Sequence, residues 1–228
     1  MTLSGSYDFS LTAREVVTYS LQKLNVLPLT QTLDADEAAA AMQELNLMLK
    51  SWQRKGPHLW KKSEGTITMV SATSSYDLTA TLNPLRILGL RYRNSGSTDL
   101  PMRSFTREQY FDLPVKTSGG NPTQFYFDPQ RGAPTLYVWP VQATVTTETL
   151  RCTYQKRIDD IDDLANDIDV PQEHLETVGY GLAARLLDSY GIEGEVAQRV
   201  LMRAAELAEE AMDWEREDII RFVPDRAR

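Results

Sequence analysis

The stretch DADEAAAAMQELNLMLKSWQRKG, residues 34–56, has the pattern of a long amphipathic helix. Asp34 with Glu37 three residues later is a helix start signal, and Gly56 before Pro57 is a stop signal. The alanine run favours helix and permits close approach of a neighbouring helix. Small or apolar side chains recur at the three-to-four spacing of one buried face: Ala38, Ala41 or Met42, Leu45, Met48 or Leu49, and Trp52.

Another helix is predicted before this stretch, beginning near Thr12. Thr12 and Glu15 have the spacing of a capping box, and Leu27-Pro28 is the expected end. Its buried face is expected to contain Val16, Ser20 or Leu21, and Leu24.

Between about residues 63 and 154 the pattern changes to β structure. Short β-branched or aromatic segments alternate with Gly, Pro, Asn and Ser clusters, which is typical of a small antiparallel sandwich or barrel. QFYFDP followed by APTLYVWP indicates a hairpin, and TREQYFDL (106–113) indicates one interrupting helix. The expected strands are GTITMV, SSYDLT, ILGLRYRN, TQFYFD, TLYVWP and ETLRCTYQ.

Two helices are predicted to follow the acidic residues 159–169. Asp169 is the expected cap of the first helix, with Pro171 in its first turn. Gly191 and Gly194 mark a break before the second helix. The buried stripes are expected to be Leu175, Val178, Leu182, Leu186 and Tyr190, then Val196, Val200, Ala204, Leu207, Ala211 and Trp214.

The fold class is therefore α+β: a helical bundle formed by both chain ends, an inserted antiparallel β module, and an extended C-terminal arm. The predicted borders are 1–62 and 159–218 for the two parts of the helical domain. They are 63–158 for the β module and 219–228 for the arm.

Composition excludes several classes of protein. The 228 residues carry a net charge of −8, and six aspartates are concentrated in residues 159–169. A broad basic face that binds nucleic acid is therefore not expected. We expect no membrane span and no secretion signal. The single cysteine, Cys152, excludes an internal disulfide and is expected in the core.

Chemistry-bearing motifs are few. His58 and His174 are the only histidines, nucleotide-binding and serine-hydrolase motifs are absent, and no metal, cofactor or catalytic site is expected. The acidic stretch could bind a hard cation such as calcium, although its spacing departs from an EF-hand loop and favours a solvated link. Its aspartates are Asp159, Asp160, Asp162, Asp163, Asp167 and Asp169.

Three phrases together carry a resemblance to a known family. They are the N-terminal helix pair (13–56), the acidic-to-helix phrase DDLANDIDVPQEHLETVGYGLAARLLDSYG (162–191), and QRVLMRAAELAEEAMDWERED (198–218). This order resembles the head-to-tail adaptor, or packaged-DNA stabilisation, proteins of short-tailed bacteriophages. The resemblance covers the helical parts, and the β insert is compatible with it.

The resemblance implies a virion structural protein at the head–tail junction, assembled in the host cytoplasm, with no enzymatic activity. It implies a ring of twelve copies beneath the portal protein, which closes the head after packaging and docks tail nozzle or fibre proteins. DNA would pass through the lumen without sequence-specific binding, and the acidic residues 159–169 are candidates to line it. A C-terminal arm would bind the portal through Arg221, Phe222, Val223, Pro224, Arg226 and Arg228.

Two other functions stay open from the sequence. One is a phage cell-wall glycosidase that uses a carboxylate of residues 159–169, which requires one buried acid. The other is a carbohydrate- or protein-binding module on the β insert, with Tyr126, Tyr137 and Trp139 as its platform. The absence of interleaved Lys and Arg favours packing over a binding role for these aromatic residues.

Overall fold

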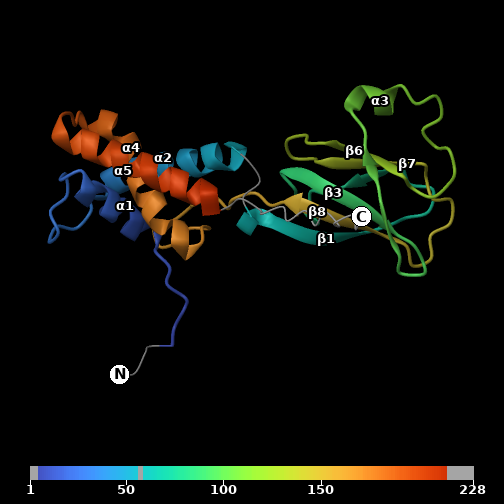
Figure 1. Ribbon diagram of the computed structural model, residues 1–228, viewed down its shortest axis with the longest axis horizontal. Coiled ribbons are helices and arrows are strands. Elements are labelled where there is room, and N and C mark those ends of the chain that lie inside the picture. Colours follow the sequence, from blue (N-terminus) through green and yellow to red (C-terminus); the bar gives the residue numbers. More distant parts are fainter. Residues whose placement is uncertain (1–4, 56–58, 215–228) are drawn as a thin grey trace, which may run out of the picture. The chain divides into compact units, whose positions relative to one another are not determined.

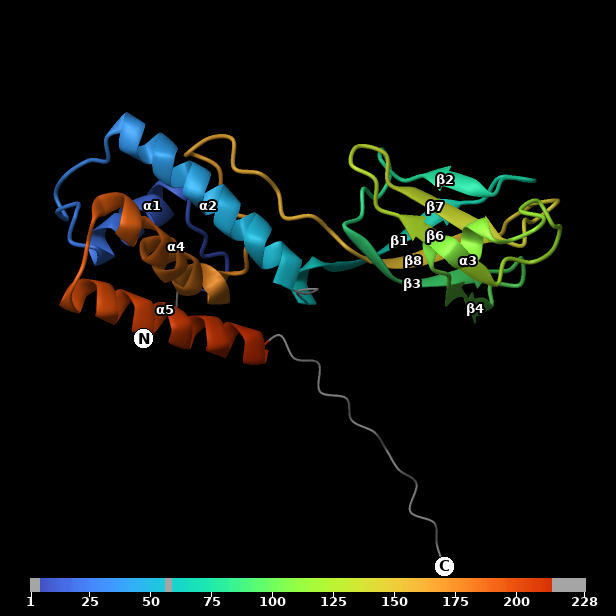
Figure 2. The same ribbon diagram turned by 90° about the horizontal axis from the view of Figure 1, so that it is seen from above.

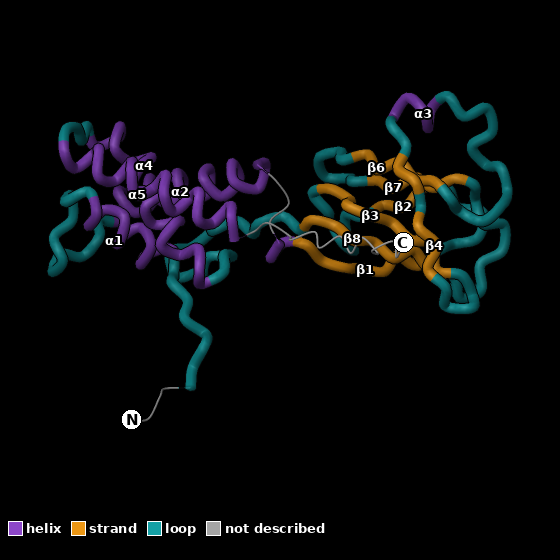
Figure 3. The backbone as a smooth tube through the Cα atoms, viewed as in Figure 1, coloured by secondary structure: helices purple, strands orange, loops and turns teal. Residues whose placement is uncertain are grey.

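The computed structural model describes residues 5–55 and 59–214, which form two compact units. One unit contains residues 5–54 and 159–214, and the other contains residues 55–158. Helices from both chain ends build the first unit, and strands dominate the second (Figures 1 and 3). The mixed α+β class, with helices from both chain ends, is thereby confirmed.

Four helices make up the helical unit: α1 (Ala13–Lys23), α2 (Ala35–Lys55), α4 (Leu175–Tyr190) and α5 (Glu195–Trp214). Helix α4 is central, since it packs against both α1 and α5, and its Gly181 lies against Met48 and Trp52 of α2. Figure 2 shows α2 and α5 on opposite sides of this unit, running in the same direction. Among the helices in the described part of the chain, none is long and apolar enough to span a membrane.

Helix α1 begins as predicted and ends earlier. The Thr12 hydroxyl accepts from the Glu15 amide at 3.3 Å, and the Glu15 carboxylate accepts from the Thr12 amide at 2.8 Å, which completes the capping box. The helix does not reach Leu27-Pro28, because Asn25 adopts a left-handed conformation (φ 59°) directly after the cap residue Leu24. Asparagine tolerates this conformation better than most residues, so it ends the helix before the proline.

Small residues allow the helices to approach closely around α4. The Ser20 hydroxyl donates to the Gly179 carbonyl at 2.8 Å, and a Cβ on Gly179 would lie 2.5 Å from Cδ1 of Tyr19. A Cβ on Gly181 would lie 3.0 Å from Sδ of Met48. Both glycines are therefore used inside the unit, where they bring α1 and α2 against α4.

The start of α4 differs from the prediction. A short 3-10 helix, Gln172–His174, precedes it, and neither helix start has a side-chain cap. Asp169 is not a helix cap, because its Oδ2 accepts from the Asp159 amide at 3.0 Å and so ties together the two ends of the acidic stretch. The end of α4 agrees with the prediction, since Gly191 adopts the left-handed conformation (φ 60°) that favours glycine.

The buried stripe of α5 is shorter than predicted. Val200 and Leu207 are buried, but Trp214 is 73% exposed at the end of the helix. The apolar periodicity of the sequence therefore continues beyond the part of α5 whose side chains are buried against the rest of the unit.

Two four-stranded sheets form the second unit. The first has the order β1 (Lys62–Thr68), β8 (Thr149–Gln155), β3 (Arg86–Arg93) and β4 (Asp99–Pro101). The second has the order β2 (Ser75–Asp77), β7 (Thr135–Trp139), β6 (Gln124–Asp128) and β5 (Arg103–Ser104). A 3-10 turn, Leu59–Lys61, precedes β1, and helix α3 (Arg107–Phe111) lies between β5 and β6.

Both sheets contribute to one hydrophobic core. The fully buried side chains include Leu150 and Cys152 from β8 and Leu136 and Val138 from β7. The position of Cys152 confirms the prediction that it is a core residue, and burial raises the pKa of its thiol to about 12.

The strand predictions were largely correct. The β6–β7 hairpin and the helix at α3 are confirmed. Strands β4 and β5 were missed because they contain only three and two residues. The pairing of β5 with β6 is parallel, so the module is not purely antiparallel as expected.

Candidate functional site

The acidic link, residues 159–169, is fixed along the helical unit at both of its ends. Ile161 and Ile168 are buried and act as apolar anchors within it. The Asn46 side chain of α2 donates to the Ile161 carbonyl at 2.9 Å and accepts from the Ile161 amide at 3.0 Å. One side chain of α2 therefore satisfies both backbone hydrogen-bonding groups of Ile161.

The other end of the link pairs with the start of α1. The amides of Ala13 and Arg14 donate at 2.9 Å to the carbonyls of Asn166 and Leu164. These two amides belong to the first turn of α1, where backbone donors have no partner within the helix. The link thus provides hydrogen-bond acceptors for two backbone amides at the N-terminus of α1. It is therefore packed against the helices and is more than a solvated connection.

The aspartates of the link point outward between these anchors. Asp159, Asp160, Asp162, Asp163 and Asp167 are exposed, and Asp169 is half-buried. Asp160 forms an ion pair with Lys50, Asp163 Oδ1 accepts from the Ala165 amide at 2.8 Å, and Asp167 Oδ2 accepts from the Ser10 hydroxyl at 3.4 Å. Their carboxylates serve local turns and ion pairs and give the link a negative surface.

This geometry provides no metal or acid–base site in the link. Within residues 5–55 and 59–214, no three His, Cys, Asp or Glu side chains are grouped so as to hold a metal ion. A glycosidase needs one carboxyl group in an apolar setting, whereas five of the six aspartates are exposed. His58 lies outside the described residues, and His174 is buried in the 3-10 turn before α4.

The proposed aromatic platform on the β unit is partly covered, since Tyr126 is buried and Tyr137 and Trp139 are half-buried. Tyr110 of α3 lies against both Tyr126 (ring centroids 5.8 Å apart) and Tyr137 (4.9 Å). The Tyr126 and Tyr137 rings are themselves stacked at 5.7 Å, and Trp139 Nε1 donates to the Val115 carbonyl at 3.0 Å. These aromatic residues pack beneath α3 and the loop after it, which favours the packing interpretation.

The predicted portal-binding arm, with Arg221, Phe222, Val223, Pro224, Arg226 and Arg228, lies outside the described residues. It therefore stays a prediction.

The structure reveals two apolar surfaces that the sequence interpretation missed. On α5, Leu201 (51% exposed), Met202 (63%) and Met212 (55%) lie on the side away from buried Val200 and Leu207. On α2, Leu47 is 51% exposed and lies among the exposed residues Ala39, Ala40 and Gln43. The signal was present in LMRAAELAEEAM, where a second apolar row, offset by one residue, accompanies the buried one.

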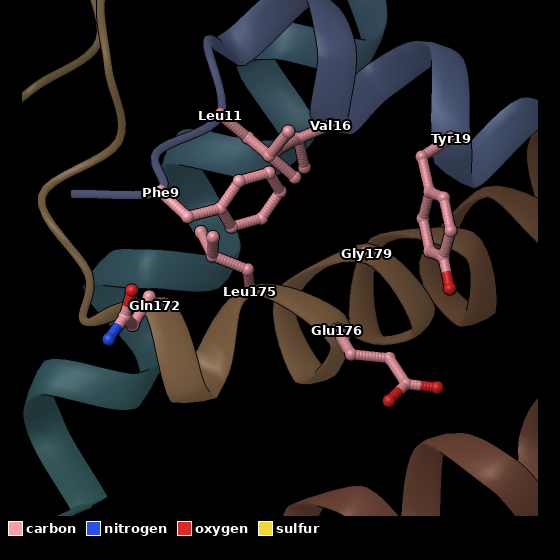
Figure 4. A pocket seen from close by; sticks show the side chains of 8 residues that line it. All are labelled: Phe9, Leu11, Val16, Tyr19, Gln172, Leu175, Glu176 and Gly179. Carbon is pink, nitrogen blue, oxygen red and sulfur yellow. The ribbon is translucent and has the colours of Figure 1, made fainter. Parts of the chain in front are cut away.

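A hollow of about 430 Å³ lies between the N-terminal segment and α4. In Figure 4 the Phe9 ring lies over Leu175, beside Leu11 and Val16, while Tyr19 and Glu176 form the far side. The hollow is mainly apolar, and its polar groups do not form a catalytic arrangement.

Comparison with known proteins identifies the family. The sequence model of the SU10 adaptor protein family matches residues 12–227, and no curated protein matches the chain. Solved structures that match include a chain from the "neck of empty GTA particle computed with C6 symmetry". That likeness is distant, with 12% identity, a TM-score of 0.30, and coverage of 82% of this chain and 85% of that chain. Because the family model spans both helical parts, the β insert and nearly all of the C-terminal segment, the chain belongs to the SU10 adaptor protein family, in agreement with its resemblance to bacteriophage head-to-tail adaptors.

Proposed function

We propose that this chain is the adaptor that joins the portal to the tail in a bacteriophage virion. The observation that carries the proposal is the match of an adaptor family over residues 12–227. In this role the protein acts by assembly: twelve copies form a ring beneath the portal, close the head after packaging and provide the docking surface for tail nozzle or fibre proteins. Assembly of the ring would take place in the host cytoplasm.

The architecture supports an assembly role. We infer a four-helix bundle that forms the body of the ring subunit and a two-sheet sandwich inserted between α2 and α4. Repeated contacts around a ring allow each single contact to be modest, because the copies bind multivalently. The exposed apolar row of α5 and the exposed Leu47 of α2 suit such contacts better than they suit a monomer.

The C-terminal segment is the proposed portal-binding arm. It contains Phe222 and Val223 as apolar anchors and Arg221, Arg226 and Arg228 as cations, and the family match includes all of these except Arg228. Such a segment suits an acidic groove, where arginine forms bidentate hydrogen bonds with carboxylates.

Truncation tests the arm together with the adaptor function. The full chain and a chain ending at Asp218 are each mixed with the purified portal, followed by pull-down and negative-stain imaging. Ring-shaped complexes that disappear on truncation are the expected result. Equal binding by both chains would remove the arm from the proposal, and no binding by either would refute the adaptor function.

The acidic link is the proposed lining of the DNA channel. Its exposed aspartates would repel phosphates, so that DNA slides past without sequence-specific contacts. Changing the exposed residues Asp159, Asp162 and Asp163 to Asn should retard DNA ejection from particles, whereas Asp188→Asn and Glu193→Gln, at exposed positions near the end of α4, should not. Unchanged ejection by the link variant would remove the link from the channel.

A further inference from the structure

We propose that neighbouring copies meet through unlike surfaces: the outer face of α5 in one copy packs against the outer face of α2 in the next. The outer face of α5 comprises Leu201, Met202, Ala205 and Met212, and the outer face of α2 comprises Ala39, Ala40, Gln43 and Leu47. The proposal rests on the ring of the proposed function and assigns its subunit contact.

The positions of the two faces fit cyclic assembly. A ring requires a heterologous contact, so that each copy has two different complementary surfaces. Helices α2 and α5 lie on opposite sides of the helical unit, with α4 between them (Figure 2). Each copy can therefore present α5 to one neighbour and α2 to the other at the same time.

Helix direction determines which residues would meet. Helices α2 and α5 run in the same direction within one copy (Figure 2). Neighbours in a ring of many copies differ by a small rotation, so α5 of one copy runs nearly parallel to α2 of the next. Their N-terminal ends then lie together, and so do their C-terminal ends.

The charges along both helices are complementary in this parallel arrangement. The last part of α5 carries Glu209 and Asp213, and the last part of α2 carries Arg54, close to Lys50, which pairs with Asp160 of its own copy. The N-terminal end of α2 carries the exposed acids Asp36 and Glu37. An antiparallel contact would instead place the acids of α5 against those of α2, which is unfavourable.

The sizes of the facing side chains are also complementary. Near its start the α2 face has the small side chains Ala39 and Ala40, whereas α5 presents the larger Leu201 and Met202 at the corresponding height. Small residues opposite large ones allow two helices to approach closely, as Gly179 and Gly181 do inside the unit.

Cysteine cross-linking tests the contact directly. The variant with Ala40→Cys and Leu201→Cys, assembled on the portal and treated with a short bismaleimide, should give a ladder of linked chains. Either substitution alone should give no linked product, because in a heterologous contact each cysteine faces a different residue. The native Cys152 is buried and serves as an unreactive background.

Charge exchange provides a second, independent measurement. Glu209→Lys and Arg54→Glu should each weaken subunit association by at least about tenfold, and the combination should restore it. The matched control is Glu210→Lys, which changes an exposed acid next to Glu209 but outside the outer face of α5.

The outcomes separate the contact from the function. Rings without a ladder and without charge rescue would overturn the contact and leave the adaptor function standing. Dimers from a single-cysteine variant would also overturn it, because they indicate like surfaces meeting. Rings that form normally while the α5 variants lose portal binding would assign that face to the portal. Absence of rings from the wild-type chain with portal would refute the adaptor function itself.

Discussion

The two units of this chain differ in where their exposed apolar side chains lie. In the β unit these side chains are scattered over loops, an edge strand and a bulge, as Val70, Leu100 and Leu88 show. In the helical unit Tyr7, Phe9 and Leu29 are also exposed outside the helices, but Leu201, Met202 and Met212 form a row on α5, and Leu47 is exposed on α2. Scattered exposure is normal for a folded domain, whereas aligned exposure indicates a surface that another molecule covers.

The units also differ in how their interiors are held together. The β unit depends on a core with fully buried leucines from both sheets. The helical unit also contains side-chain hydrogen bonds to the backbone, such as Asn46 with Ile161, and close contacts at glycine, such as the Tyr19 ring against Gly179. Substitutions should therefore separate residues that stabilise the fold from residues that serve assembly.

The largest expected effect is in the β core. Leu150→Ala removes a fully buried side chain and should lower the free energy of unfolding by about 2–5 kcal/mol. Leu201→Ala on α5 is the matched control and should change it by no more than about 0.5 kcal/mol. Denaturant unfolding of both variants measures the difference. An equal loss for Leu201→Ala would mean that its side chain is covered within the folded monomer.

A smaller effect is expected at the link. Asn46→Ala leaves the amide and carbonyl of Ile161 without their side-chain partner and should cost about 1–3 kcal/mol. Hydrogen exchange should increase in residues 159–169, while the β strands stay protected. Gln43→Ala, an exposed position one turn earlier on α2, should leave both measurements unchanged. If exchange in the link does not respond to Asn46→Ala, the side chain does not hold it.

The sequence was sufficient to predict most of the elements, because their signals are local. The Thr12–Glu15 box, the Ala38–Leu49 face of α2 and the alternation around Cys152 each depend on neighbours within a few residues. Strand β5 could not be predicted, because two residues carry no period and its pairing with β6 is decided by tertiary contacts. The end of α1 before Asn25 was not predicted, because Pro28 is the stronger helix-stop signal in the sequence.

The site was predicted less well than the fold. The six aspartates of the link were found from composition, but their anchoring depends on Asn46 and on the amides of Ala13 and Arg14, which are more than a hundred residues away in sequence. The outer face of α5 was missed because the sequence interpretation assigned one apolar stripe to this helix, from Val196 to Trp214, of which Val200 and Leu207 are buried. A second apolar row on the same helix becomes visible only when the first is known to be buried.

A third substitution tests the close approach of α1 and α4. Gly179→Ala places a Cβ 2.5 Å from Cδ1 of Tyr19, and the overpacking should cost about 1–3 kcal/mol. The gain in helix propensity offsets up to about 1 kcal/mol of this. Thermal unfolding measures the net loss. Gly181→Ala is the control, since its nearest neighbour is the flexible Met48 side chain at 3.0 Å, and it should be close to neutral. Equal effects at both positions would show that the Tyr19 ring moves aside freely.

The smallest effect concerns the ionisation of Tyr19 at the same contact. Burial, helped by nearby Tyr180 and Glu176, raises the pKa of Tyr19 from 10.0 to about 12, although Arg203 opposes the shift. The pKa is raised because the folded state favours the neutral Tyr19 side chain. The contribution of this side chain to folding stability is therefore complete below pH 10 and is lost as the pH rises through about 12. Stability measured across this alkaline range should fall less steeply for Tyr19→Phe, which cannot ionise, than for the wild type. Identical alkaline slopes would mean that the ring is solvated and that the α1–α4 contact is looser than the Gly179 geometry requires.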